Sequence, residues 1–171
     1  MEQRINEILE FVELTDRADD KSRRYSGGMK RRLMIGMALL HKPKMLFLDE
    51  PTVGLDPQVR RKMWDLIRKM NEAGMTVLLT THYIEEADQL CRRVAIMNRG
   101  RIIAVDTPQK LKEKVGRVVV EHMEADGMIN NFFDNREQAA SYVAGLDSNA
   151  TVREANLEDV FIELTGRRVN D

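Results

Sequence analysis

The stretch MLFLDEPTVGLDP, residues 45–57, decides the fold of this chain. It begins with four apolar residues, and two adjacent acids, Asp49 and Glu50, follow directly. A short, wholly apolar run of this kind predicts a strand that is covered on both faces. Asp56 before Pro57 is typical of a helix N-cap followed by proline at the first helical position. The stretch therefore predicts a strand, a turn that carries two carboxylates, and then a helix.

The residues that follow complete a strand–helix–strand crossover. Apolar residues at helical spacing continue the helix as far as Gly74, and residues 76–80 form a second apolar run. Such a crossover makes the two strands parallel, so their carboxyl ends lie at the same edge of the sheet. Ligands of open α/β sheets bind at that edge. His82 follows the second strand, so we expect its imidazole to lie near Asp49 and Glu50.

Two adjacent acids at a strand end predict a division of roles in phosphoryl transfer. Asp49 would hold Mg²⁺ through its water shell, and Glu50 would polarise the attacking water as general base. His82 would hydrogen-bond the terminal phosphate and position that water, because this chemistry depends mainly on positioning and charge neutralisation. The structural alternative is that Asp49 caps a turn and Glu50 is a solvated charge. His82, taken alone, is more often structural.

Three small residues, Ser26, Gly27 and Gly28, open an earlier helix that we expect to run to about Leu40. The backbone N–H groups, the hydroxyl and the positive end of the helix dipole make such an opening an anion site, and glycine lets the backbone approach a phosphate closely. Taken alone, an ordinary serine N-cap is the favoured explanation. The neighbouring basic residues add positive charge but fit a solvated helix face equally well: Arg23, Arg24, Lys30, Arg31 and Arg32.

The spacing of apolar and turn residues predicts the other elements. We expect helices over residues 2–14, 84–92, 108–114, 138–144 and 157–165, and strands over residues 94–97, 101–105, 117–121 and 150–153. The turn residues 98–100 join two of these strands into a hairpin. The character of the sequence changes near Gly116, which predicts a small appended α+β module. His122 and residues 130–133 within it are expected to be structural.

The composition of the chain, which has 171 residues and a net charge of −1, excludes several classes of protein. A nearly neutral chain has no overall field that attracts nucleic acid. A single cysteine, Cys91, excludes an internal disulfide and fits a reducing compartment. No apolar run approaches the roughly 18–20 residues that span a bilayer, and the first residues are too polar for a secretory signal. We expect a cytosolic piece that can dock on a membrane protein.

Taken together and in order, these motifs resemble those of ATP-binding-cassette (ABC) ATPases. Residues 25–29 resemble the signature motif, with Met29 where glutamine is commonest. Residues 45–50 resemble the Walker B strand, residues 54–56 the D-loop, and His82 the switch histidine.

A narrower resemblance points to one branch of the family. Residues 50–57 together with residues 80–87 are similar to the ATPases that drive ABC-2-type exporters, including antibiotic-resistance and sodium-efflux ATPases. The tail, residues 156–166, is similar to the C-terminal end of those subunits.

The resemblance implies a fold and a set of partners. The expected fold is α/β: an incomplete P-loop NTPase sheet with part of the helical subdomain and a small C-terminal α+β module. It divides the chain into residues 1–42 (helical subdomain), 43–115 (ATPase core) and 116–171 (accessory module). The implied ligands are ATP and Mg²⁺. The implied partners are a second ABC ATPase subunit and an integral membrane permease, on the cytoplasmic face of the membrane.

The family arrangement also implies which nucleotide each residue serves, because two ATPase domains meet head to tail around two ATP molecules. The residues that would contact the terminal phosphate of the partner's ATP are Ser26, Gly27 and Gly28. Asp56 would lie at the dimer interface. The residues that would serve the nucleotide of their own subunit are Asp49, Glu50 and His82.

No G-x-x-x-x-G-K-[ST] phosphate loop occurs in the sequence. The resemblance places that loop upstream of Met1, so the chain alone is expected to be inactive, although Ser26 to Gly28 could still complete a partner's site. In the family's sheet the phosphate-loop strand lies between strands 76–80 and 94–97. Both strands are therefore expected to have unpaired edges, which predicts poor solubility or a need for a partner chain.

The leading hypothesis is the ATPase subunit of an ABC exporter, and two alternatives stay open. The first is a non-transport ABC ATPase half of the chromosome-maintenance type. A long coiled coil should precede the signature motif in that class, and residues 1–24 offer about three helical turns. The second is a catalytically inactive module that binds a partner. The transported substrate is not encoded in an ATPase subunit, because the membrane partner selects it.

Overall fold

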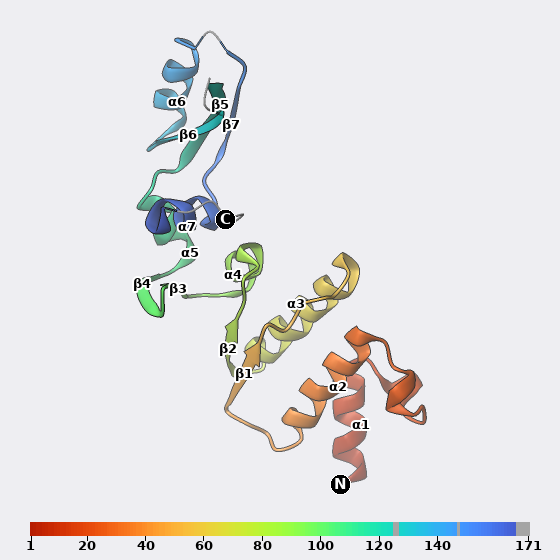
Figure 1. Ribbon diagram of the computed structural model, residues 1–171. Helices are drawn as coiled ribbons and strands as arrows, with labels where there is room; N and C mark the ends of the chain where they lie inside the picture. Colours follow the sequence, from red (N-terminus) through yellow and green to blue (C-terminus); the bar gives the residue numbers. More distant parts are fainter. Residues whose placement is uncertain (125–126, 147, 167–171) are drawn as a thin grey trace. The chain divides into compact units, whose positions relative to one another are not determined.

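The computed structural model describes residues 1–124, 127–146 and 148–166. The chain falls into two compact units, Met1–His82 and Tyr83–Asp171, and each is described by itself (Figure 1). The division between them falls inside the segment 43–115 that the resemblance assigns to one ATPase core. The division into three segments, which follows the resemblance, therefore stays a prediction. The compact units of the structure divide the chain at one point, between His82 and Tyr83.

The first unit is built from helices and a parallel pair of strands. Its elements are α1 (Glu2–Phe11), 3₁₀ turns at Thr15–Arg17 and Ser22–Arg24, α2 (Gly27–Leu39), β1 (Met45–Asp49), α3 (Pro57–Glu72) and β2 (Thr76–Thr80). The helix predicted over residues 2–14 ends at Phe11, and Glu13 just beyond it has a left-handed backbone with a φ of 56°. Most predicted boundaries in this unit agree with the structure within one or two residues.

The ends of α3 follow the capping chemistry of the sequence. One carboxylate oxygen of Asp56 accepts hydrogen bonds from the backbone N–H groups of Gln58 (3.0 Å) and Val59 (2.9 Å). Pro57 occupies the first helical turn, and Gly74 follows the helix with a φ of 87°. The predicted N-cap and C-terminal glycine are thereby confirmed.

Strands β1 and β2 pair in parallel, as predicted, with Asp49 opposite Thr80. Helix α3 packs against β2 on one face. The other face leaves apolar side chains exposed: Met45 by 43%, Phe47 by 68% and Leu78 by 51%. The prediction that this strand is covered on both faces is wrong for the described residues, because α3 covers one face of the sheet. Among those residues β2 pairs only with β1, so one edge of β2 has no strand partner.

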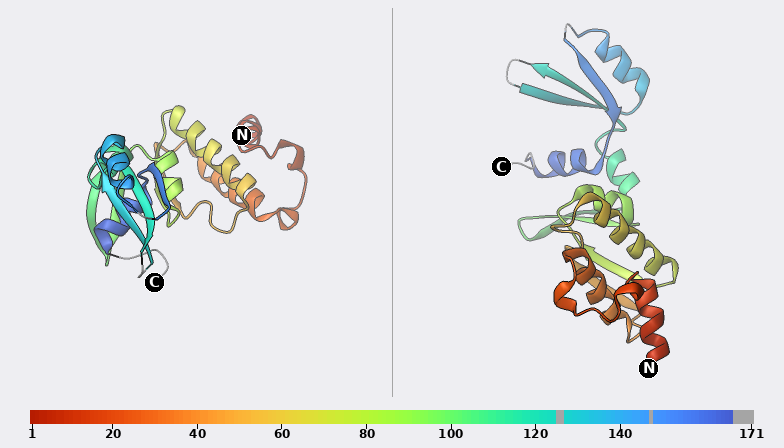
Figure 2. Two further views of the ribbon diagram at one scale, coloured as in Figure 1. Left: turned by 90° about the horizontal axis from the view of Figure 1, so that it is seen from above. Right: turned by 90° about the vertical axis from the view of Figure 1, so that its right-hand side faces the viewer.

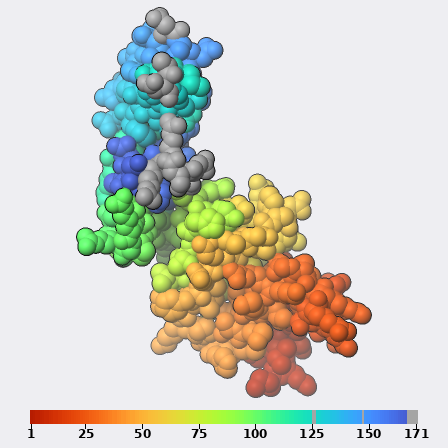
Figure 3. Space-filling model, viewed as in Figure 1, coloured from red at the N-terminus to blue at the C-terminus, as the bar shows by residue number. Residues whose placement is uncertain are grey.

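Helices α1 and α2 pack closely because of a glycine. A Cβ atom on Gly36 would lie 3.0 Å from Ile8 Cγ2 and 3.3 Å from Val12 Cγ1. A larger residue at this position would push the two helices apart. Figure 3 shows the helical side of this unit as a packed surface that runs from the red α1 to the yellow α3.

The second unit combines a hairpin, a three-stranded sheet and helices. Its elements are α4 (Ile84–Leu90), β3 (Val94–Asn98), β4 (Arg101–Asp106), α5 (Pro108–Glu113), β5 (Val118–Glu124), β6 (Gly127–Phe133), α6 (Arg136–Val143), β7 (Ala150–Glu154) and α7 (Leu157–Thr165). The β3–β4 hairpin is antiparallel, as predicted. Strand β6 was not predicted. Within the described residues β3 pairs only with β4.

Strands β6, β5 and β7 form an antiparallel sheet in that order, and α6 packs along one face (Figure 2). His122 of β5 is only 3% exposed on that face. Its Nε2 lies 3.1 Å from the Tyr142 hydroxyl and 3.0 Å from Asn131 Nδ2. These partly buried contacts around the buried imidazole support the structural role that the sequence predicted for His122.

Helix α7 joins the end of the chain to the elements before Gly116. Leu157 and Val160 of α7 share one buried cluster with Ile96 of β3 and Leu111 of α5. The last helix of the segment after Gly116 thus packs on the hairpin and on α5 within the second unit.

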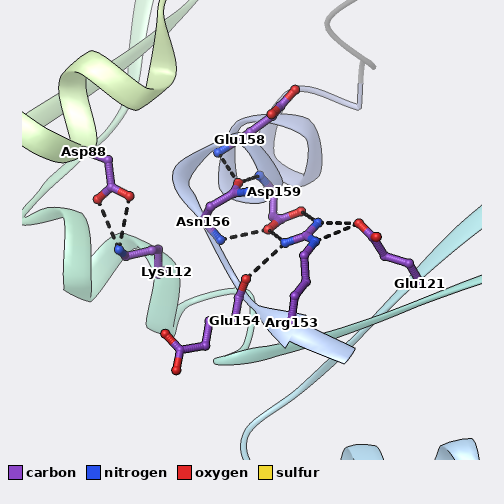
Figure 4. A network of polar contacts seen from close by, with 8 residues as sticks. All are labelled: Asp88, Lys112, Glu121, Arg153, Glu154, Asn156, Glu158 and Asp159. Atoms are coloured by element: carbon purple, nitrogen blue, oxygen red, sulfur yellow. Dashed lines mark hydrogen bonds and ion pairs between the residues drawn. The ribbon is translucent and has the colours of Figure 1, made fainter. Parts of the chain in front are cut away.

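A charged network holds the start of α7 (Figure 4). Arg153 of β7 donates from Nη1 and Nη2 to the two carboxylate oxygens of Asp159, each at 2.7 Å, and from Nε to Glu121 at 2.7 Å. Asp159 also accepts from the Asn156 N–H (2.8 Å), which completes a capping box. The hydrogen bonds to Asp159 raise the pKa of Arg153 above its usual value, against the opposing effect of partial burial. The guanidinium therefore stays charged throughout the neutral range.

Candidate functional site

Glu50 and His82 meet at the shared carboxyl edge of β1 and β2. Glu50 Oε2 lies 2.6 Å from His82 Nδ1, which makes an ion pair when the imidazole is protonated. Both side chains remain accessible, with exposures of 37% for Glu50 and 60% for His82. The structure therefore brings together the two residues that the sequence predicted as the catalytic pair.

Asp49 lies beside them and is oriented by a neighbour that sequence reasoning missed. The Thr80 hydroxyl donates to Asp49 Oδ1, and the Glu50 N–H donates to Thr80 O at 3.0 Å. Thr80 could have been found from the strand register alone, since it is the residue opposite Asp49. Its hydroxyl fixes the carboxylate at the strand end.

The donor chemistry here fits Mg²⁺ in part. Among the described residues no group of three or more His, Cys, Asp or Glu side chains is placed to hold a metal ion. Mg²⁺ commonly binds through one or two carboxylates, with waters and substrate phosphate oxygens as its other ligands. A single oriented carboxylate, Asp49, meets that requirement. When bound, the ion would neutralise charge on the transferred phosphate.

Glu50 occupies a backbone conformation that is unusual for its residue type. Its φ is 48°, in the left-handed region that residues with a side chain rarely adopt. Such strain persists where surrounding contacts fix it and is common at functional sites. The contacts that fix it come from Arg31 of α2, whose guanidinium donates to the carbonyl oxygens of Asp49 (2.7 Å), Glu50, and Pro51 (3.2 Å). Nothing in the sequence distinguishes this role of Arg31 from that of a solvated charge on the helix face.

The two glycines of the signature segment play different structural parts. Ser26 caps α2, and its hydroxyl oxygen accepts from the Met29 N–H at 3.3 Å. A Cβ on Gly28 would lie 2.3 Å from Val59 Cγ1, because the start of α2 packs on the start of α3. A Cβ on Gly27 would meet nothing within 4 Å. Gly28 is therefore needed for packing, whereas Gly27 leaves open space at a helix N-terminus.

This contrast predicts that alanine substitution of the two glycines has different effects on stability. Gly28→Ala should lower the free energy of unfolding by about 1–3 kcal/mol through overpacking, and Val59→Ala should relieve much of that loss. Gly27→Ala should change stability by no more than about 0.5 kcal/mol. Urea denaturation of the three variants measures this, and equal losses for the two glycine variants would contradict the packing argument.

Asp56, predicted at a dimer interface, is occupied within the chain as the N-cap of α3. The same packing places the cap near the signature segment, since Leu55 Cδ2 would lie 3.8 Å from a Cβ on Gly28. The structure thus presents two groups in the first unit: Asp49, Glu50 and His82 at the sheet edge, and Ser26 to Gly28 with Asp56 at the adjoining helix starts. One carboxylate oxygen of Asp56, Oδ1, accepts both hydrogen bonds of the cap.

Comparison with known proteins agrees with this geometry. A family model described as "ABC transporter" matches residues 1–53. The chain is 38% identical over 200 residues to the linearmycin resistance ATP-binding protein LnrL of Bacillus subtilis, with 98% of this chain and 64% of LnrL covered. It is 42% identical over 185 residues to the Nod factor export ATP-binding protein I of Burkholderia thailandensis, with 96% and 61% covered. The chain thus spans a little under two thirds of the length of these relatives.

Solved structures give the same fold. The ADP conformation of MJ1267, an ATP-binding cassette of an ABC transporter, matches with a TM-score of 0.59 and 29% identity, over 63% of this chain and 42% of that one. The protein cbiO1 of Clostridium perfringens, part of the ABC transporter complex cbiONQ, matches with a TM-score of 0.61 and 32% identity, over 64% and 44%. These chains are ABC ATPase cassettes of the P-loop NTPase fold, of which this chain contains part. The chain belongs to the ABC ATPase family, of whose cassette it contains part.

Proposed function

We propose that this chain is part of the ATP-hydrolysing subunit of an ABC-type membrane exporter, and that Asp49, Glu50 and His82 form its catalytic group. Glu50 is the general base that takes a proton from the attacking water. His82 orients that water and the terminal phosphate. Asp49 holds Mg²⁺. ABC ATPases in general bind ATP with Mg²⁺, and both are proposed here as ligands of the complete subunit.

The observation that carries the proposal is the 2.6 Å separation between Glu50 Oε2 and His82 Nδ1. These residues follow different strands and are 32 positions apart in the sequence (82 − 50). An ion pair with a purely structural role does not need to be exposed to solvent. This pair instead keeps exposed area on both side chains at the sheet edge where α/β ligands bind, although the contacting oxygen, Glu50 Oε2, is itself covered.

The signature segment is proposed to serve a second subunit. Ser26 and Gly27 stand at the N-terminus of α2, a helix of 13 residues whose backbone N–H groups and dipole favour an anion. Their proposed ligand is the terminal phosphate of ATP held on the phosphate loop of that subunit, with Asp56 at the interface. The sequence contains no phosphate-loop motif of its own, and the exposed apolar face of β1 and β2 favours a further covering segment in the complete subunit.

The exporter assignment rests on the relatives. The two relatives described above are named for linearmycin resistance and Nod factor export, and cbiO1 is part of a transporter complex. By analogy, an integral membrane permease is proposed as the partner, with the subunit on the cytoplasmic face of the membrane. No described helix is long and apolar enough to cross a membrane. The non-transport alternative is disfavoured because the two relatives compared above are named for resistance and export.

A chimera tests the proposal. We would place a phosphate-loop segment from an ABC relative before Met1 and measure phosphate release from ATP with and without Mg²⁺. Mg²⁺-dependent turnover is expected, because the chimera would contain both the phosphate cradle and the catalytic group. The chain without that segment should bind Mg-ATP at millimolar concentration or not at all. Micromolar binding by the chain alone, or a well-folded chimera that binds ATP without turnover, would contradict the proposal.

A further inference from the structure

The contacts of Arg31 gather three consecutive carbonyl oxygens onto one side chain. Nη2 donates to Asp49 O at 2.7 Å and to Glu50 O, and Nε donates to Pro51 O at 3.2 Å. These carbonyls belong to the turn that leaves β1 and carries the two acids. Arg31 itself belongs to α2, five positions after the cap residue Ser26 (31 − 26).

This arrangement has a specific physical requirement. Three carbonyl dipoles that converge on one point repel one another unless a donor group lies between them. Arginine supplies five N–H donors in a planar fork, whereas lysine supplies a single compact ammonium group. The guanidinium therefore stabilises a turn in which Glu50 has its left-handed φ of 48°.

We propose that Arg31 is a positioning residue: it fixes the turn that aims Glu50 at His82, and it ties that turn to the helix that begins with the signature segment. This inference rests on the proposed function of both groups. Its consequence is that the sheet-edge group and the helix N-terminus are mechanically linked within one subunit. A phosphate bound at Ser26 would then act on the carboxylate that serves the other nucleotide, through α2 and Arg31.

The next residue on α2 provides a matched control. Arg32 Nη1 also donates to backbone carbonyls, those of Val12 (3.0 Å) and Glu13 (3.2 Å), and contacts Glu13 Oε2 at 3.2 Å. It contributes to the fold in the same way as Arg31 but makes no hydrogen bond to the acidic turn among the residues that the structure describes. Arg31→Met and Arg32→Met should therefore both lower the unfolding temperature, and only Arg31→Met should change the site.

The first measurement uses the chain as it stands. The chain has three histidines, so their ring signals can be resolved by NMR. Arg31→Met should shift the His82 ring signals and leave those of the buried His122 unchanged, while Arg32→Met should leave both unchanged. An unchanged His82 signal in a folded Arg31→Met chain would overturn the inference. If that variant does not fold, Arg31→Lys, which keeps the charge and loses the fork, takes its place with the same criterion.

The second measurement separates the inference from the function it rests on. In the phosphate-loop chimera, Arg31→Met should lower kcat by about 100-fold, the effect of misplacing a catalytic group by about 1 Å, with KM for ATP unchanged. Arg31→Lys should recover part of that loss. If the unsubstituted chimera turns over ATP and Arg31→Met turns over equally fast, the inference fails and the function stands. If the unsubstituted chimera folds and binds ATP without turnover, the proposed function fails, and the His82 signal still decides the placement of the turn.

Discussion

Replacing Glu50 by glutamine should reduce ATP turnover in the phosphate-loop chimera by about 100- to 10,000-fold, the range of a general base. Glutamine has the same shape but cannot take a proton from the attacking water. The KM for ATP should stay within about twofold, because a loss confined to the transition state lowers kcat without changing ground-state binding. Steady-state kinetics of phosphate release measures both quantities.

Glu13 supplies a close control for this substitution. It is also a glutamate with a left-handed backbone, at a φ of 56°, and it is paired with a basic side chain, Arg32, at 3.2 Å. Glu13→Gln should therefore reproduce any effect of losing a charge at such a position while leaving turnover intact. If Glu50→Gln retained full turnover in a chimera that binds ATP, Glu50 would not be the base.

Replacing Asp159 by alanine should destabilise the second unit by an amount on the order of 3 kcal/mol, the cost of removing one partner from a buried ion pair. The side chain of Asp159 is 2% exposed, and it accepts both Nη groups of Arg153. Its loss leaves a partly buried guanidinium with Glu121 as its remaining carboxylate partner among the described residues. The cap on the Asn156 N–H is lost as well.

Amide hydrogen exchange in β5 measures the effect, because protection there reports the opening of the second unit. Trp64 lies in the first unit, so its fluorescence reports the unfolding of that unit and serves as an internal reference for an effect confined to the second. Glu158→Ala, which removes the adjacent acid from the first turn of α7, should cost only a few tenths of a kcal/mol. Equal losses for the two variants would contradict the network's role.

The pH dependence of the Asp159 effect has a definite sign. A base whose pKa is raised on folding contributes stability that is present below its unfolded pKa and lost only as pH rises through the folded pKa. The raised pKa of Arg153 lies in strongly alkaline solution. The difference in stability between Asp159→Ala and the unsubstituted chain should therefore be constant from neutral to mildly alkaline pH.

Local signals in the sequence were sufficient for much of the fold. Asp56 before Pro57 located the start of α3. The apolar runs on either side of that helix predicted the parallel strand pair, with the two acids after the first strand and the histidine after the second. Those features depend on residues close in sequence, and they placed Glu50 beside His82. Strand β6 was missed because apolar and polar residues come in pairs there, with Asn130 and Asn131 adjacent, and do not alternate.

The rest depended on contacts between distant residues. Arg31 carries the same charge as Arg32, and nothing in their spacing separates the one that reaches the acidic turn. Gly28 read as a phosphate-binding glycine, and its close approach to Val59 depends on how two helices cross. The apolar run that contains Phe47 predicted a strand covered on both faces, yet Phe47 is exposed. An apolar run indicates that a face needs a cover but does not indicate which segment provides it.

A hydrogen bond joins the two ends of the segment between α5 and α7, and it bears on how that segment can vary in evolution. The Ala155 N–H donates to Arg117 O at 3.0 Å, so the chain returns, after the β5–β7 sheet and α6, to the point from which it departed. A segment whose two ends are neighbours can be lengthened, shortened or exchanged without displacing the helix that follows it. The β5–β7 sheet and α6 can therefore vary in length or sequence while α7 stays packed on α5.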